Sequence, residues 1–174
     1  MGNGMRETEV RRAQSACPGC GVVLDEFDGP THPYIGASPA CWAVYGDVLG
    51  REYGEFGYPE IHRLTVDAYA AQHPGMESRR ASQSVAIHLI ALHLRFDEGM
   101  SASEILRAIR TTVARGKSYE WLTPPSYADA LTIVDVRGAA DLEEHVSRVE
   151  AWGRSVWDAW ATHHETVQRW ASGS

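Results

Sequence analysis

The three cysteines of the chain are spaced as metal ligands often are. Cys17 and Cys20 stand at the two ends of a Cys-Pro-Gly-Cys turn, and Cys41 lies near the start of a predicted helix. Such a turn places two thiolates on one side of the backbone, and a helix start stabilises a thiolate through its free N–H groups. Zinc binds sets of cysteine and histidine of this kind. We therefore expect zinc as the cofactor, held by the three cysteines and one further ligand.

A redox-active CxxC motif is the main alternative to zinc. Redox motifs of this type open a helix within a βαβ pattern. Residues 21–37 instead contain the loop-forming segments Asp28-Gly29-Pro30 and His32-Pro33. For this reason we favour a zinc site over a redox site and over inert buried thiols.

Two histidines compete for the fourth ligand position. His32 lies in the loop that separates the second cysteine from the third, so it is within reach along the chain. His73 ends the second predicted helix. A short turn joins this helix to the helix that begins before Cys41, so the two helices should pack antiparallel. The end of the second helix then lies beside Cys41, which favours His73 as the ligand and leaves His32 as the alternative.

Capping residues and helix breakers divide the rest of the chain into helices. Ser38-Pro39 is typical of a helix start, because serine caps the first turn and proline fits its first position. Ser101 and Glu104 match a capping box. The predicted helices cover residues 38–53, 59–73, 78–98, 101–115 and 139–170, the last with a kink or division at Gly153.

One helix should be central and one segment is ambiguous. The middle of helix 78–98 is apolar on all sides, which indicates a buried helix. Residues 131–136 form the one plausible strand, although Thr132 and Asp135 could instead cap a helical turn. The prediction is a mainly α, bundle-like single domain of five or six helices, with an N-terminal zinc knuckle and little or no strand.

Length and composition are those of one globular domain. The chain has 174 residues, of which 44% are hydrophobic and 22% charged. We expect a flexible arm over residues 1–15 and a single zinc-stabilised helical domain over residues 16–174. The formal net charge is -7, so nucleic acid is not an expected partner. The sequence has neither an apolar run long enough for a membrane span nor a signal-peptide core, so we expect no membrane partner and a cytoplasmic location.

Four residues outside the cysteine set are candidate catalytic residues, namely His62, His88, Asp67 and Tyr69. His62 and His73 lie about three turns apart on one helix, or ~16 Å, so they cannot share a metal. The next helix returns antiparallel and should bring His88 level with His62, and facing histidines build catalytic sites in bundles. Asp67 and Tyr69 could act as an acid–base pair. The alternative is structural: each histidine bonds a carboxylate or a carbonyl, and Tyr69 belongs to the core with its hydroxyl near the knuckle.

The last helical segment carries residues that fit either interpretation. Its tryptophans could line a ligand pocket, but their spacing is more typical of helix packing. Its acidic and histidine side chains could complete a histidine cluster. These are Glu144, His145, His163, His164 and Glu165.

Two segments carry a resemblance to a known pattern. The first is Cys17-Pro-Gly-Cys20-Gly with Cys41 after it, and the second runs from His62 to Pro74 in the form HxLTVxxYxxQHP. Together they resemble an uncharacterised bacterial family that is known only as a domain of unknown function. The resemblance is close over residues 17–75 and looser beyond, and it implies no activity. It implies these marked positions: Cys17, Cys20, Cys41, His62, Tyr69, Gln72 and His73.

Two functions fit these observations. The first is a zinc-binding module with a structural Cys3His site that pins the N-terminal loop to a helical core, with an unknown protein or small-molecule partner. The second is a metal-dependent enzyme of small-molecule metabolism, which uses His62 and His88 or an open position on the zinc. Three thiolates favour a structural role for the metal. Convergence of the two histidines in one cavity would favour the enzyme.

Overall fold

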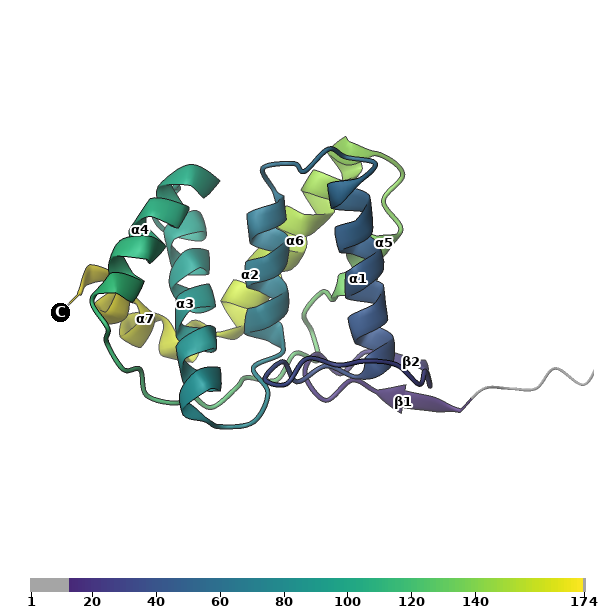
Figure 1. The fold of residues 1–174 in the computed structure, drawn as a ribbon, viewed down its shortest axis with the longest axis horizontal. Coiled ribbons are helices and arrows are strands. Elements are labelled where there is room, and N and C mark those ends of the chain that lie inside the picture. Colours follow the sequence, from purple (N-terminus) through teal and green to yellow (C-terminus); the bar gives the residue numbers. More distant parts are fainter. Residues whose placement is uncertain (1–12, 174) are drawn as a thin grey trace, which may run out of the picture.

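The computed structural model describes residues 13–173 and shows a mainly α fold (Figure 1). Within this range the chain forms seven α-helices, one 3-10 helix and a two-stranded antiparallel sheet. The elements are β1 (Gln14–Ala16), β2 (Val23–Asp25), α1 (Pro39–Tyr53), α2 (His62–Gln72), α3 (Arg79–Phe96), α4 (Ala102–Ala114), α5 (Ile133–Arg137), α6 (Leu142–Ala159), η1 (Ala161–His163) and α7 (His164–Ser172). The predicted fold class is confirmed.

An arm was predicted over residues 1–15, and its residues 1–12 lie outside the described part of the chain. Gln14 and Ser15 belong to β1, where they pair with Asp25 and Leu24 of β2. Among the described helices, none combines the length and the apolar character that a membrane span needs.

The helix starts predicted at Ser38 and Ser101 are present and carry their caps. The side chain of Ser38 accepts a hydrogen bond from the backbone N–H of Cys41 at 3.2 Å, and Pro39 is the first residue of α1. Before α4, Ser101 and Glu104 form a complete capping box. These local bonds fix where α1 begins, and with it the position of Cys41.

The structure differs from the predicted elements at several places, and α2 begins at His62 and not at residue 59. The strand predicted at residues 131–136 is wrong, because Thr132 and Asp135 cap the short helix α5 in the way the alternative allowed. These apolar residues have no neighbouring strand to pair with, so the local caps decide the conformation. The last segment divides after Trp160, where η1 intervenes, and α6 runs unbroken through Gly153.

The helices place the knuckle, the start of α1, the end of α2 and the start of α3 at one end of the molecule (Figure 1). α2 packs against both α3 and α6, while α7 packs on α3. Most of the central part of α3 is buried, as the sequence predicted.

Buried tryptophans of α6 and the following turn fix the end of α2. The indole N–H of Trp152 donates to the side-chain oxygen of Gln72 at 3.0 Å, and that of Trp160 donates to the carbonyl of Ala71 at 3.3 Å. Both indoles are fully buried. These side chains therefore pack the core and hold the residue that precedes His73, and they do not line a ligand pocket.

At Gly153, α6 packs closely against Leu64 of α2. A Cβ atom built at this glycine would lie 2.9 Å from Cδ1 and 3.1 Å from Cγ of Leu64. The glycine therefore serves packing between helices and does not divide α6.

We predict that Gly153→Val lowers the free energy of unfolding by about 1–3 kcal/mol, because the added atoms overpack the contact with Leu64. The matched control is Gly46→Val in α1, where a Cβ meets nothing within 4 Å. That variant should stay within about 0.5 kcal/mol of the wild type, since glycine and valine differ little in helix propensity. Urea unfolding measures both, and equal stability of the two variants would contradict the packing role of Gly153.

Candidate metal centre

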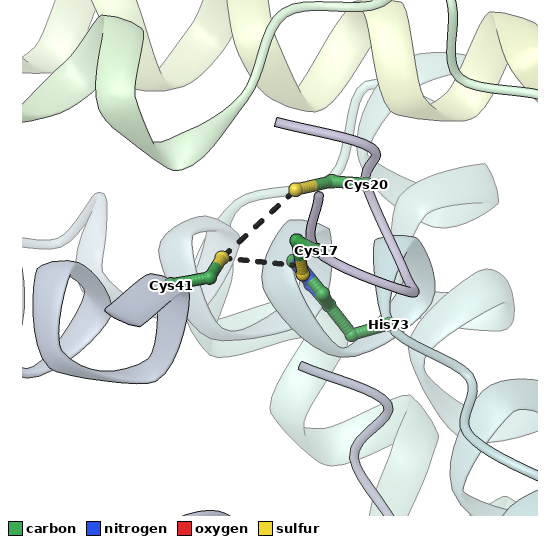
Figure 2. Close-up of side chains that lie close together, drawn as sticks. All are labelled: Cys17, Cys20, Cys41 and His73. Atoms are coloured by element: carbon green, nitrogen blue, oxygen red, sulfur yellow. Dashed lines mark hydrogen bonds between the residues drawn. The ribbon is translucent and has the colours of Figure 1, made fainter. Parts of the chain in front are cut away.

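Three cysteines and one histidine meet in the interior of the protein (Figure 2). The ligand atoms of Cys17, Cys20, Cys41 and His73 all lie within 4.8 Å of one another, and all four residues are buried. His32 is not part of this group. The structure therefore gathers the predicted cysteines with the favoured histidine in an arrangement that could bind a metal.

Two distances within the group are close to those of a tetrahedral site. The sulfurs of Cys20 and Cys41 are 3.9 Å apart, and the sulfur of Cys41 is 3.4 Å from Nε2 of His73. Tetrahedral zinc with ordinary bond lengths requires about 3.8 Å between two sulfurs and about 3.6 Å between sulfur and nitrogen. The cysteines are free thiols, so the group is not built around a disulfide.

The first two cysteines are presented by a short hairpin. β1 and β2 flank the knuckle, and the N–H of Cys17 donates to the carbonyl of Val22 at 2.8 Å. The N–H of Gly21 donates back to the carbonyl of Cys17 at 2.9 Å. Gly21 has a φ of 78°, which a residue with a Cβ rarely adopts. This turn aims both thiols at the start of α1.

A second glycine of the knuckle admits the histidine. A Cβ at Gly19 would lie 2.4 Å from Cδ2 of His73 and 2.7 Å from the carbonyl oxygen of Gly36. The loop before α1 is held to the same place, because the N–H of Gly36 donates to the carbonyl of His73 at 3.0 Å. Gly19 is therefore required by close approach of the imidazole.

Hydrogen bonds preset the histidine as a ligand. Nδ1–H of His73 donates to the carbonyl of Tyr69 at 2.8 Å, so Nε2, which faces the sulfurs, is the nitrogen that can bind a metal. A metal-binding histidine commonly holds its other nitrogen in this way. The ring also stacks on Tyr69, with 4.1 Å between the centroids.

Two donors from outside the group stabilise negative charge on the sulfurs. The hydroxyl of Tyr69 donates to the sulfur of Cys41 at 3.6 Å, and the backbone N–H of Ser38 donates to the sulfur of Cys17 at 3.4 Å. Tyr69 is 1% exposed, and the structural interpretation made for it from the sequence is the one observed. Burial, followed by the charge of Cys41, raises the pKa of Tyr69, which keeps its hydroxyl protonated as a donor.

Without a cation between them, the three neighbouring thiols cannot all ionise, because their negative charges would repel one another. Hydrogen bonds from Cys20 and Cys41 lower the pKa of Cys17, while bonds to Cys17 and Cys20, followed by burial, raise the pKa of Cys41. A divalent cation removes this conflict, because a coordinated thiol is deprotonated and its charge is compensated.

His32 packs among aromatic rings beside the centre. Its ring lies edge-on to Tyr34, with 4.3 Å between the centroids, and 5.5 Å from the ring of Trp42. Nδ1 of His32 is buried, and within the described part of the chain no hydrogen-bond partner for it is found. This placement gives His32 a packing role in the loop.

The candidate catalytic histidine His62 belongs to a buried carboxylate network. Nδ1 of His62 lies 2.6 Å from Glu52, which also accepts hydrogen bonds from Thr65 at 2.5 Å and from His145 at 2.8 Å. Glu52 is 0% exposed. Burial opposes ionisation, but the bonds from His145, Thr65 and His62 outweigh it and hold the pKa of Glu52 below its usual value.

His88 and Asp67 form a different network on another side of α2. Nδ1–H of His88 donates to Oδ1 of Asp67 at 2.8 Å, and Arg63 donates to Oδ2 at 2.7 Å. Positions 62 and 67 point about 140° apart around a helix. The structure therefore does not bring His62 and His88 to a common site, and Asp67 pairs with His88 and not with Tyr69.

Sequence reasoning overlooked Glu52, although a signal for it exists. Cys41, Val44, Tyr45 and Val48 form the buried face of α1, and Glu52 continues their spacing. A carboxylate on an apolar helix face must find partners inside the protein. The other histidines named for a cluster bond carbonyls: His163 bonds Thr123 and His164 bonds Trp157.

We predict that Glu52→Gln lowers the free energy of unfolding at neutral pH by about 1–3 kcal/mol, because an amide nitrogen cannot accept from His62 and leaves a buried donor unpaired. A carboxylate with a lowered pKa contributes stability only while it is ionised. The difference between wild type and variant should therefore shrink as the pH falls below about 4.3, the pKa of an unfolded glutamate. Urea unfolding from about pH 3 to about pH 7 measures this stability difference. A difference that is independent of pH would contradict the ionised network.

Comparison with known proteins places the chain in a family. No curated protein and no solved structure matches it at a significant level. The model of a family of unknown function (DUF5946) matches residues 15–161, which include the four residues of the candidate metal centre and the helices from α1 to α6. Because this match covers most of the described structure, the chain belongs to the family of unknown function DUF5946.

Proposed function

We propose that Cys17, Cys20, Cys41 and His73 bind one zinc ion in a closed structural site, and that the protein is a binding module built around this site. The observation that carries the proposal is the meeting of the ligand atoms of four buried residues within 4.8 Å of one another. The ligand chemistry supports zinc, because three thiolates and one imidazole are a common zinc set.

The role proposed for the ion is to link segments that are far apart in the sequence. The knuckle contributes two ligands, the first turn of α1 contributes Cys41, and the end of α2 contributes His73. An ion at this point holds the loop between the knuckle and α1 against the helices. Its binding free energy adds to the stability of the folded state, as it does in other structural zinc sites.

The enzyme alternative has less support. A catalytic zinc keeps a position open to water or substrate, whereas each of the four ligands here is 4% exposed or less. The second basis for that alternative was a site shared by His62 and His88, and these histidines bond separate carboxylates.

We predict that the purified wild-type protein carries one zinc per chain and that Cys20→Ala carries none. The loss should lower the melting temperature by roughly 10 °C or more, because the ion's binding free energy is part of the folding free energy. Elemental analysis by mass spectrometry and thermal unfolding measure the two effects. A metal-free protein that keeps its full melting temperature would rule out the structural role.

A matched pair of histidine variants tests the fourth ligand. His73→Ala should lose zinc to a mild chelator far more readily than the wild type, since three thiolates remain without the imidazole. His32→Ala changes a neighbouring histidine that lies outside the group, and it should retain zinc as the wild type does. The reverse order of zinc loss would assign the ligand to His32 and contradict the proposal.

A further inference from the structure

A cavity of about 640 Å³ lies between the start of α3, the end of α4 and the loop that precedes α1. We call it the cationic pocket. Its charged and polar lining comes from Arg79, Arg80, Gln83, Ser84, His88 and Lys117. The volume is in the range of pockets that hold small molecules.

The charge of the cationic pocket is opposite to that of the chain. Arg79, Arg80 and Lys117 contribute three positive charges, and the lining contains no acidic side chain, whereas the whole chain has a formal net charge of -7. Lys117 donates to the carbonyl of Gly173 at 2.8 Å, and within residues 13–173 no carboxylate pairs with it. The guanidinium of Arg80 lies 5.5 Å from the centre of the Tyr34 ring. This ring carries no negative charge, so it does not neutralise the guanidinium. The positive charge is therefore available to a ligand.

His88 is held in a fixed orientation in the wall of the pocket. Asp67, which is 2% exposed, accepts the hydrogen bond from Nδ1–H of His88, and Arg63 holds the other oxygen of Asp67. Among the described residues no partner of Nε2 of His88 is found, so this nitrogen is free for a ligand. It donates when the ring carries two protons and accepts from a P–OH group when it carries one.

Further donors surround the same space. Ser84 lies one helical turn before His88, and Gln83 lies beside it. α3 has 18 residues and begins at this pocket with the cap Ser78, so the positive end of its dipole adds to the charges of Arg79 and Arg80.

We infer that the cationic pocket binds the phosphoryl group of a phosphorylated small molecule. A phosphate dianion can engage several cations at once, and arginine binds its oxygens in pairs. A single carboxylate would leave most of this positive charge uncompensated. Nε2 of His88 and the side chains of Ser84 and Gln83 supply hydrogen bonds to the remaining oxygens.

The inference rests on the proposed function in one respect, since it names the ligand of the proposed binding module. The candidate metal centre and the cationic pocket are physically joined. A Cβ at Gly75, two residues after His73, would lie 2.9 Å from the carbonyl oxygen of Tyr34, and the N–H of Gly36 donates to the carbonyl of His73. The loop that brings Tyr34 to the pocket is thus held at the metal centre.

The test is calorimetric titration of the full-length protein with inorganic phosphate and pyrophosphate at low ionic strength, with acetate as the carboxylate probe. Zinc content is measured on the same samples. Phosphate and pyrophosphate should bind with one site per chain, and acetate should bind at least about tenfold more weakly. Arg80→Gln should weaken phosphate binding by about tenfold or more, because a charged hydrogen bond contributes on that scale.

The matched control is Arg137→Gln, which removes the same charge from α5, where Arg137 pairs with Asp47 at 3.0 Å. It should bind phosphate as the wild type does. Equal weakening of both variants would show a general charge effect and overturn the inference, as would acetate binding that equals phosphate binding. Zinc-loaded protein that binds no phosphate overturns the pocket assignment alone. Phosphate binding by protein that never carries zinc supports the pocket and contradicts the proposed zinc site.

Discussion

The meeting of three sulfurs with one imidazole is the constraint on which the knuckle end of the molecule depends. The thiols of Cys17, Cys20 and Cys41 are crowded together with the imidazole of His73. Neighbouring thiols and burial raise the pKa of Cys41 for this reason. The same point fixes the hairpin, the start of α1 and the end of α2 relative to one another. Gly19 and Gly36 permit this approach, because a side chain at Gly19 would collide with the imidazole of His73 and one at Gly36 with the backbone of Gly75.

α1 is attached to the rest of the protein by polar groups near both of its ends. At its start Cys41 joins the candidate metal centre, and in its last turn Glu52 bonds His62 of α2 and His145 of α6. Asp67 performs a comparable role between α2 and α3 through His88. Three histidines outside the metal centre, His62, His88 and His145, thus serve as hydrogen-bond partners of buried carboxylates. This explains how a helical protein tolerates charged groups in its interior, since each has several hydrogen-bond partners.

Local sequence features predicted most of the helices and the cysteine group, because caps, breakers and a short turn act over a few residues. The antiparallel turn between α1 and α2 is why His73 was favoured over His32. Prediction failed where distant residues decide the outcome. Glu52 and His145 are 93 positions apart in the sequence, so nothing local showed that they share a bond with His62. Likewise the apolar residues at 131–136 resemble a strand, and only the absence of a neighbouring strand together with the cap at Thr132 makes them helical.

The order of the elements along the chain has a consequence for biosynthesis. All four residues of the candidate metal centre precede residue 74, whereas α6, which covers α2, begins at Leu142. As the chain is synthesised, the four residues therefore leave the ribosome before α6 does, and Leu64 then lacks its contact with Gly153. The indole of Trp152, which holds Gln72 in the folded protein, follows Gln72 by 80 residues. The four residues can thus come together early, whereas the hairpin of α1 and α2 obtains the cover that α6 gives to α2 only later.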